Sequence, residues 1–246
     1  MLNPCDLPEG DERQVHCSLK ATASQSVKVS RFLTCCLFAM TVLSMPTQRI
    51  AILISGGGSN MRAIVEASNR RRWNDRFGAV ISGVVSNQAA AAGLQWAEAK
   101  GIPTRVCPHR DYPSREAFDE ALMQAVDGLT DQAPPDWVVL AGFMRILTPA
   151  FVQHYDGRLL NIHPSLLPAF PGLNTHQRAI EMGCRIAGAT VHRVTAALDH
   201  GEILGQAAVP VLADDTPDQL AARVLTQEHR LYPDVLERLL QTRLQA

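Results

Sequence analysis

Short runs of apolar, often β-branched residues alternate along the chain with segments in which apolar residues recur at helical spacing. From residue 49 onward this alternation is regular, as in the strand-helix-strand units that build a mostly parallel sheet. The runs with strand character are Ile50–Ile54, Ala79–Val85, Thr104–Cys107, Trp137–Leu140, Leu159–Ile162, Thr190–Val194 and Gln206–Val211. We therefore expect an α/β fold with helices between the strands.

Helical periodicity is clearest in three segments. Two of these helices are expected to begin at Ser59 or Asn60 and at Ser114. The third follows Thr216, which can cap a helix, with Pro217 suited to its first turn and Gln219 completing a capping box. Pro233 should end or kink this last helix, because proline lacks the N–H that a helix interior uses.

The part of the chain after residue 48 is predicted to form one α/β domain, 49–246. No repeat, low-complexity tract or linker divides it. Residues 1–48 differ, because a stretch with basic residues precedes the apolar run Phe32–Val42. That order is typical of a signal peptide. The alternative, which we favour, is a mis-assigned start, with Met45 as the true first residue of the protein.

The composition of the chain is that of an ordinary globular protein. Hydrophobic residues make up 46% and charged residues 19% of the 246 residues, and the net charge is −1, as in ordinary globular proteins. A nearly neutral chain lacks the basic surface that nucleic-acid binding requires, so no nucleic-acid partner is expected. The apolar run near the N-terminus is shorter than the roughly 20 residues that span a bilayer, so no membrane partner is expected.

The cysteines and histidines do not predict a metal site. Four of the six cysteines lie within the first 36 residues, and no Cys-x-x-Cys pair occurs. The histidines do not fall at the spacing of zinc ligands. We therefore expect no metal, and a reducing cytoplasm is the simplest compartment for this chain.

A glycine-rich stretch, Ser55–Asn60, lies between a predicted strand and a predicted helix. Glycines let the backbone turn tightly and bring N–H groups near a ligand, and a helix N-terminus favours an anion such as phosphate. The spacing matches neither a dinucleotide-binding loop nor a Walker loop. A phosphate site and a plain tight turn are equally consistent with these residues.

A second polar group follows the strand Leu159–Ile162. Asn161 and His163 are two positions apart, so in an extended segment both side chains project to the same side. Ligands of open α/β sheets gather where strands end, and this pair can donate hydrogen bonds or carry a proton. A single histidine of this kind is more often a structural hydrogen-bonding group than a catalyst.

A third candidate is Asp199, in a turn between two predicted strands. A carboxylate beside His163 would favour the protonated ring and fix its orientation. Taken alone, Asp-x-Gly is usually just a turn.

Five motifs together resemble those of the folate-dependent phosphoribosylglycinamide formyltransferases. They are Ile54–Asn60, Leu140–Leu147, Asn161–Pro168, Pro171–His176 and Thr226–His229. The resemblance implies a Rossmann-like formyltransferase fold, a mostly parallel sheet flanked by helices. It also implies transfer of the formyl group of 10-formyltetrahydrofolate to the amine of 5-phosphoribosylglycinamide in de novo purine biosynthesis. Partners would be small molecules, and the protein a cytoplasmic monomer or homodimer.

The resemblance also assigns roles to individual positions. The implied catalytic residues are Asn161, His163 and Asp199. The implied nucleotide-binding residues are Gly58, Ser59, Asn60, Thr226, Gln227 and Glu228. The implied folate-binding residues are Arg115, Met144, Arg145, Ile146, Leu147, Asn161, Thr195, Ala196, Ala197, Leu198 and Asp199.

Other functions share parts of this pattern. A formyltetrahydrofolate hydrolase has the same core behind a regulatory domain, and a methionyl-tRNA formyltransferase has a further C-terminal domain. The chain could also be a nucleotide-binding module without catalytic activity. In that case the presence of Asn161, His163 and Asp199 together would be a coincidence. Glu202 departs from the family pattern, where proline is frequent, and a charge there is expected to affect the neighbouring folate loop.

Overall fold

The computed structural model describes residues 45–130 and 133–245 of the chain. The strands are β1 (Gln48–Ile54), β2 (Ala79–Ser86), β3 (Thr104–Val106), β4 (Trp137–Leu140), β5 (Leu159–His163), β6 (Ile186–Arg193) and β7 (Ile203–Pro210). The helices are α1 (Ser59–Arg70), α2 (Trp73–Phe77), α3 (Ala92–Ala99), η1 (His109–Asp111), α4 (Arg115–Asp127), α5 (Pro149–His154), α6 (Thr175–Glu181) and α7 (Pro217–Gln245). Most of the N-terminal extension, including Phe32–Val42, lies outside the described residues.

The strands form one sheet in the order β3-β2-β1-β4-β5-β6-β7. Neighbouring strands are parallel from β3 to β5, whereas β6 is antiparallel to both β5 and β7. The expected α/β fold with a mostly parallel sheet is confirmed. The chain order reverses between β1 and β4, and in such sheets ligands bind beyond the carboxyl ends of the strands at this point.

The hairpin of β6 and β7 begins earlier in both strands than the sequence predicted. The segment before Thr190 contains alanine and glycine, which have low strand propensity, so local pattern did not mark it. Pairing with β7 nevertheless extends β6 back to Ile186. At Gly188 a side chain is excluded, because an added Cβ would lie 2.0 Å from the carbonyl oxygen of Ala207.

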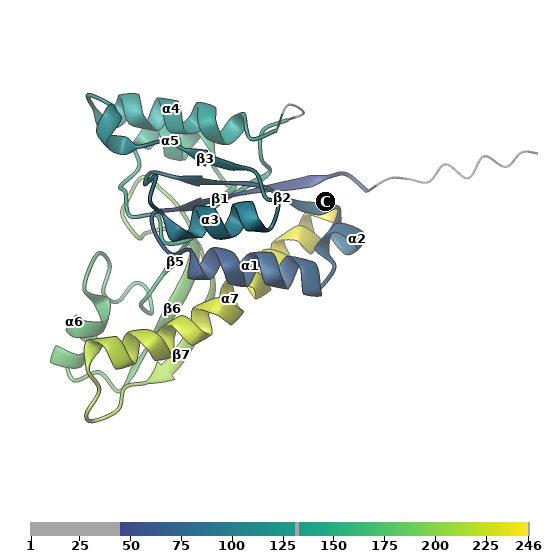
Figure 1. The fold of residues 1–246 in the computed structure, drawn as a ribbon. Helices are drawn as coiled ribbons and strands as arrows, with labels where there is room; N and C mark the ends of the chain where they lie inside the picture. The colour runs from purple at the N-terminus through teal and green to yellow at the C-terminus, as the bar shows by residue number, and fades with distance from the viewer. Residues whose placement is uncertain (1–44, 131–132, 246) are drawn as a thin grey trace, which may run out of the picture. The chain divides into compact units, whose positions relative to one another are not determined.

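Alternation along β1 divides the core into two layers. Ile50, Ile52 and Ile54 belong to the cluster that includes residues of α1, α3 and α7. Ala51 and Leu53 belong to the cluster that includes residues of α4 and α5. Figure 1 shows these two groups of helices on opposite sides of the sheet. A central strand buried on both faces in this way gives the loops at its carboxyl end a rigid base.

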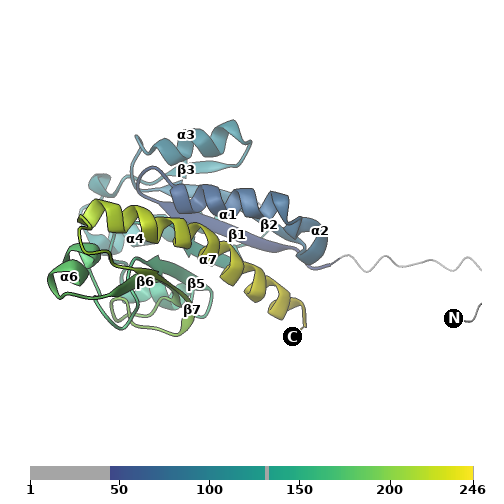
Figure 2. The same ribbon diagram turned by 90° about the horizontal axis from the view of Figure 1, so that it is seen from below.

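The last helix does not end at Pro233, which was one of the two predicted outcomes. Thr216 and Gln219 form the expected capping box, since the Thr216 N–H donates to Gln219 Oε1 at 2.8 Å and the Gln219 N–H to Thr216 Oγ1 at 3.3 Å. Pro233, however, does not end the helix, which continues to Gln245. Figure 2 shows α7 running beside α1. Burial of residues such as Tyr232 and Leu236 along this length outweighs the lost hydrogen bond.

Within residues 45–130 and 133–245, no helix combines the length and apolar character needed to cross a bilayer.

Candidate active site

Three loops that carry the predicted polar residues emerge at neighbouring strand ends. Ser55 follows β1, Gly142 lies shortly after β4, and His163 is the last residue of β5. The Ser55 N–H donates to the Gly142 carbonyl at 3.1 Å, so the first two loops are in direct contact. The candidate site therefore begins at the reversal point of the sheet.

The glycine-rich loop leaves backbone N–H groups available. Gly58 has φ +66°, a conformation that favours glycine, and no side chain caps α1, which begins at Ser59. An added Cβ at Gly56 or Gly57 would meet nothing within 4 Å, so the loop faces open space. Uncapped N–H groups at the start of a helix of this length favour an anionic ligand.

A buried carboxylate lies beside this loop. Asn60 Nδ2 donates to Glu228 Oε2 at 2.6 Å, and the two residues are only 6% and 7% exposed. Burial raises the pKa of Glu228, while the hydrogen bond from Asn60 acts in the opposite direction. Asn60 Oδ1 is buried and has no partner. A polar ligand that entered here would meet one unused acceptor and one carboxylate.

Two acceptors hold the ring of His163. Its Nε2 lies 3.0 Å from the Phe170 carbonyl oxygen, and its Nδ1 lies 3.5 Å from Asp199 Oδ2, an ion-pair distance. A neutral imidazole donates through one nitrogen, whereas the protonated ring can serve both acceptors. Asp199 is itself fixed, because its Oδ2 accepts from the Gly172 N–H at 2.7 Å and its backbone has φ +49°.

Asn161 is oriented by a histidine that the sequence did not single out. In the antiparallel register of β5 and β6, Asn161 lies opposite His192. His192 Nδ1 is 3.0 Å from the Arg193 carbonyl oxygen and therefore carries the hydrogen. Its Nε2, 3.2 Å from Asn161 Nδ2, is then the acceptor. Burial lowers the pKa of His192, which keeps the ring neutral and able to accept.

The loop after β5 is tied to the hairpin through Thr190. The Thr190 hydroxyl donates to the Ser165 carbonyl at 2.7 Å and accepts from the Leu167 N–H at 3.0 Å. Gln206 Nε2 donates to the Leu167 carbonyl at 2.9 Å and to the Thr190 hydroxyl at 3.0 Å. These bonds fix the loop that brings the Phe170 carbonyl to His163.

The predicted folate-binding residues lie mostly on exposed loops. Met144 and Ile146 are 73% and 58% exposed, and Arg115 is exposed at the first position of α4. Residues 195–198 are exposed in the loop before Asp199. Arg145 is half-buried, with its guanidinium 5.9 Å from the ring centre of Phe118. Exposed apolar side chains beside a polar centre suit a flat, partly apolar ligand.

The predicted residues of α7 are placed unequally. Glu228 is buried at the glycine-rich loop, whereas Thr226 is exposed and its hydroxyl donates to the Ala222 carbonyl within the helix. Gln227 is half-buried, one position before Glu228. Of these three residues, Glu228 is the one that a hydrogen bond joins to the site.

Glu202 forms an ion pair on the strand side of its loop. Its Oε2 accepts from Arg193 Nε at 2.7 Å, and its side chain is 65% exposed. The added charge is therefore balanced by a neighbouring cation.

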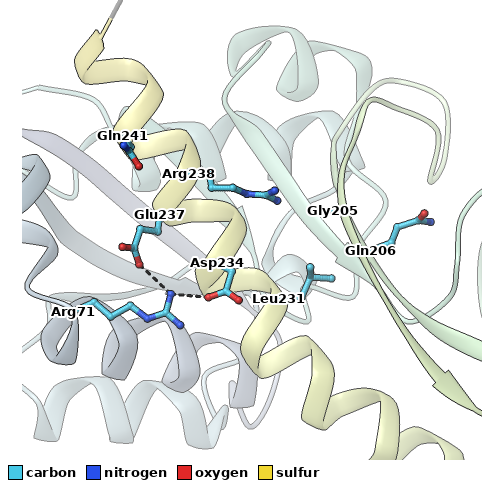
Figure 3. Close-up of a pocket in the computed structure, with 8 residues that line it drawn as sticks. All are labelled: Arg71, Gly205, Gln206, Leu231, Asp234, Glu237, Arg238 and Gln241. Carbon is cyan, nitrogen blue, oxygen red and sulfur yellow. Dashed lines mark hydrogen bonds and ion pairs between the residues drawn. The ribbon is translucent and has the colours of Figure 1, made fainter. Parts of the chain in front are cut away.

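A separate cavity of about 550 Å³ lies along the C-terminal half of α7. It is lined by Arg71, Gly205, Gln206, Leu231, Asp234, Glu237, Arg238 and Gln241 (Figure 3). Arg71 Nη1 lies 2.6 Å from Asp234 Oδ1 and 2.9 Å from Glu237 Oε2, so its charge is already neutralised. These ion pairs join the C-terminal end of α1 to α7. The charged residues of the cavity therefore stabilise the packing of the two helices.

Comparison with known protein families gives one extended match. The model of the formyl transferase family matches residues 48–236. This range contains all of the predicted site residues.

Individual relatives carry a more specific name. Phosphoribosylglycinamide formyltransferase of Escherichia coli strain K12 is 50% identical over 187 residues, which cover 76% of this chain and 84% of that protein. The human trifunctional purine biosynthetic protein adenosine-3 is 46% identical over 189 residues, 77% of this chain and 18% of that protein.

Solved structures that are similar to this chain carry corresponding names. Phosphoribosylglycinamide formyltransferase from Brucella melitensis superposes with a TM-score of 0.72 at 51% identity, covering 79% of this chain and 96% of that one. Glycinamide ribonucleotide transformylase 1 from Symbiobacterium toebii gives 0.74 at 42% identity, covering 80% and 89%.

Proposed function

The chain belongs to the formyl transferase family, and we propose that it transfers a formyl group from 10-formyltetrahydrofolate to the amine of 5-phosphoribosylglycinamide. The observation that carries this proposal is the convergence of three groups, a carboxylate, an imidazole and a carboxamide, at the end of β5. His163 lies 3.5 Å from Asp199, and Asn161 lies on the same strand as His163. These are the groups that an acyl transfer needs to stabilise an oxyanion and move a proton.

The reaction begins when the amine of the nucleotide attacks the formyl carbon. A carbon–nitrogen bond forms, and the formyl oxygen becomes an oxyanion on a tetrahedral centre. The second N–H of the Asn161 amide and an N–H of protonated His163 donate to this oxygen. Removing one such donor from an acyl-transfer site typically slows the reaction by about 10²- to 10³-fold.

Collapse of the tetrahedral centre breaks the bond between the formyl carbon and N10 of the folate. The attacking amine must lose a proton and the departing N10 must gain one, so the overall transfer is balanced. Asp199 faces His163 Nδ1, orients the ring and helps to move this proton. In the described structure His163 Nε2 is hydrogen-bonded to the Phe170 carbonyl. The bound substrate would compete with that carbonyl for the N–H.

The two substrates occupy two neighbouring groups of loops at this centre. The uncapped start of α1, with Gly58, Ser59 and Asn60, receives the nucleotide phosphate. Glu228 and its neighbours Thr226 and Gln227 complete the nucleotide site. Folate lies against the exposed loop Met144–Leu147, Arg115 and the loop Thr195–Asp199.

The test is an absorbance assay of the purified 246-residue chain with 10-formyltetrahydrofolate, with and without 5-phosphoribosylglycinamide. Release of tetrahydrofolate that depends on the nucleotide supports transfer. Equal release without the nucleotide would show a hydrolase instead. The relatives described above are named as formyltransferases, a transformylase or a purine biosynthetic protein, which favours transfer over hydrolysis.

A further inference from the structure

Ser55 joins the two substrate loops through both its backbone and its side chain. The Ser55 N–H donates to the Gly142 carbonyl at 3.1 Å. Its hydroxyl oxygen accepts from the Met144 N–H at 2.8 Å. Ser55 directly precedes Gly56, the first glycine of the nucleotide loop, and Met144 is the first residue of the proposed folate loop. One residue thus fixes the spacing between the two loops.

A neighbouring amide sets the direction of the Ser55 hydroxyl. That hydroxyl donates to Asn87 Oδ1 at 2.6 Å, which leaves its lone pairs for the Met144 N–H. Asn87 is 2% exposed, and its Nδ2 lies 3.2 Å from His109 Nδ1. The amide oxygen is therefore turned toward Ser55 and the amide nitrogen toward His109. Asn87 is buried and Ser55 and His109 are half-buried, and a chain of hydrogen bonds of this kind holds its members in one geometry.

Hydrogen bonds at both ends hold the folate loop, in addition to the packing of its half-buried residues Arg145 and Leu147. Met144 and Ile146 are largely exposed. The loop is anchored at its start by Ser55 and at its end by Asp119, whose Oδ2 accepts from the Thr148 N–H at 2.6 Å. A shift of the glycine-rich loop would move the Ser55 hydroxyl and with it the Met144 N–H.

We propose that Ser55 is a positioning residue that couples the two substrate sites. Phosphate binding at residues 56–60 orders the loop that contains Ser55, and the Ser55 hydroxyl then holds the folate loop in its binding position. This inference rests on the proposed function. By linkage, nucleotide must raise the affinity for folate by the same factor by which folate raises the affinity for nucleotide.

The experiment is calorimetric titration of the full chain with tetrahydrofolate, alone and with saturating 5-phosphoribosylglycinamide. This pair carries no formyl group, so no reaction occurs. In the wild type, nucleotide should tighten tetrahydrofolate binding by about fivefold or more, the range typical of coupled sites. In Ser55→Ala the factor should fall to about one. Ser55→Cys keeps the size of the side chain with a weaker donor and acceptor, and it should lose most of the coupling.

Ser82→Ala is the matched control, because Ser82 is buried on β2 and its hydroxyl has no hydrogen-bond partner among the described residues. It should keep the wild-type factor. A wild type that shows no coupling, or folded Ser55→Ala and Ser55→Cys variants that keep the wild-type factor, would overturn the inference. Formyl transfer is assayed on the same preparations. A wild type that transfers the formyl group but shows no coupling refutes this inference alone, whereas a wild type that transfers no formyl group refutes the proposed function.

Discussion

His163 Nδ1 lies 3.5 Å from Asp199 Oδ2, although the histidine ends a strand and the aspartate lies in a loop of the following hairpin. The same carboxylate oxygen accepts from the Gly172 N–H at 2.7 Å. A backbone donor therefore holds the carboxylate in place whether or not His163 carries a charge. Asp199 is therefore held in a fixed position beside His163.

Replacing Asp199 with asparagine should slow formyl transfer far more than it weakens nucleotide binding. Asparagine can still accept from the Gly172 N–H, but it removes the negative charge that faces the His163 ring. We expect kcat to fall by about 10²- to 10⁴-fold, the usual contribution of a positioned acid or base. Steady-state kinetics and a calorimetric Kd for the nucleotide measure the two effects.

The control for this change is Glu202→Gln, which removes a nearby carboxylate that pairs with Arg193 and is largely exposed. It should alter kcat by less than about twofold, since exposed ion pairs contribute little. Equal losses of rate and nucleotide affinity in Asp199→Asn would contradict the role proposed for Asp199.

The His192→Phe variant should be folded but slow. Phenylalanine keeps the ring and removes the acceptor at Nε2, so the Asn161 amide loses the bond that orients it. We expect kcat to fall about tenfold or more, because one oxyanion donor is misplaced. His154→Phe, on the exposed side of α5, serves as the control in the same assay. Unchanged kcat in His192→Phe would exclude a positioning role.

The same variant tests the charge state of His192 through the pH dependence of stability. Burial lowers the pKa of His192 below its ordinary value, so the folded state takes up this proton less readily than the unfolded chain. The stability that results is present above about pH 6.5 and is lost as pH falls toward the lower folded-state pKa. Between pH 7.5 and 5.5, the melting temperature of the wild type should therefore fall further than that of His192→Phe.

Other groups also contribute to the pH dependence of stability, and the comparison of wild type with variant removes their contribution. Asp119 and Glu228, whose pKa values burial raises, act in the opposite direction, but both are present in each protein. If the melting temperatures of wild type and variant change equally between pH 7.5 and 5.5, His192 is not the neutral acceptor described.

The Glu228→Gln variant should be more stable than the wild type at neutral pH. Burial raises the pKa of Glu228, so the charged carboxylate costs stability in the folded state, and this cost appears as pH rises above the unfolded value. Glutamine can still accept from Asn60 and carries no charge. We expect the melting temperature at pH 7.5 to rise by about 2 °C or more and the difference to shrink toward pH 4.5.

This gain should be accompanied by weaker nucleotide binding, because the carboxylate that the ligand meets is gone. Differential scanning calorimetry and a nucleotide titration measure the two quantities. A variant that is less stable at pH 7.5, or that binds nucleotide as tightly as the wild type, would show that Glu228 has another role.

Local pattern predicted the parts of the fold that local physics determines. The run Trp137–Leu140 matches β4 in full, because it is apolar and short, follows Pro135 and Asp136, and is soon followed by Gly142. Thr216 and Gln219 marked the start of α7 through side chains that bond to nearby N–H groups. These signals require only a few consecutive residues, so a single sequence contains them.

Features that depend on distant contacts were missed. The role of His192 follows from the register between β5 and β6, which places it opposite Asn161. Pro233 lies inside α7 because packing of the whole helix outweighs one missing bond. The ion pair of Glu202 with Arg193 likewise depends on how the hairpin closes. The resemblance to a family supplied the roles of Asp199 and Glu228, which pattern alone did not distinguish from a turn and a helix surface.

We propose that the formyl group moves from folate to the nucleotide amine at the centre formed by Asn161, His163 and Asp199. The most direct measurement uses 10-formyltetrahydrofolate labelled with ¹³C in the formyl group and follows the label by mass spectrometry. We predict that the wild type transfers one label to the nucleotide for each tetrahydrofolate released, and that His163→Ala transfers essentially none while still binding the nucleotide. Label recovered as free formate, or transfer that persists in His163→Ala, would contradict the account.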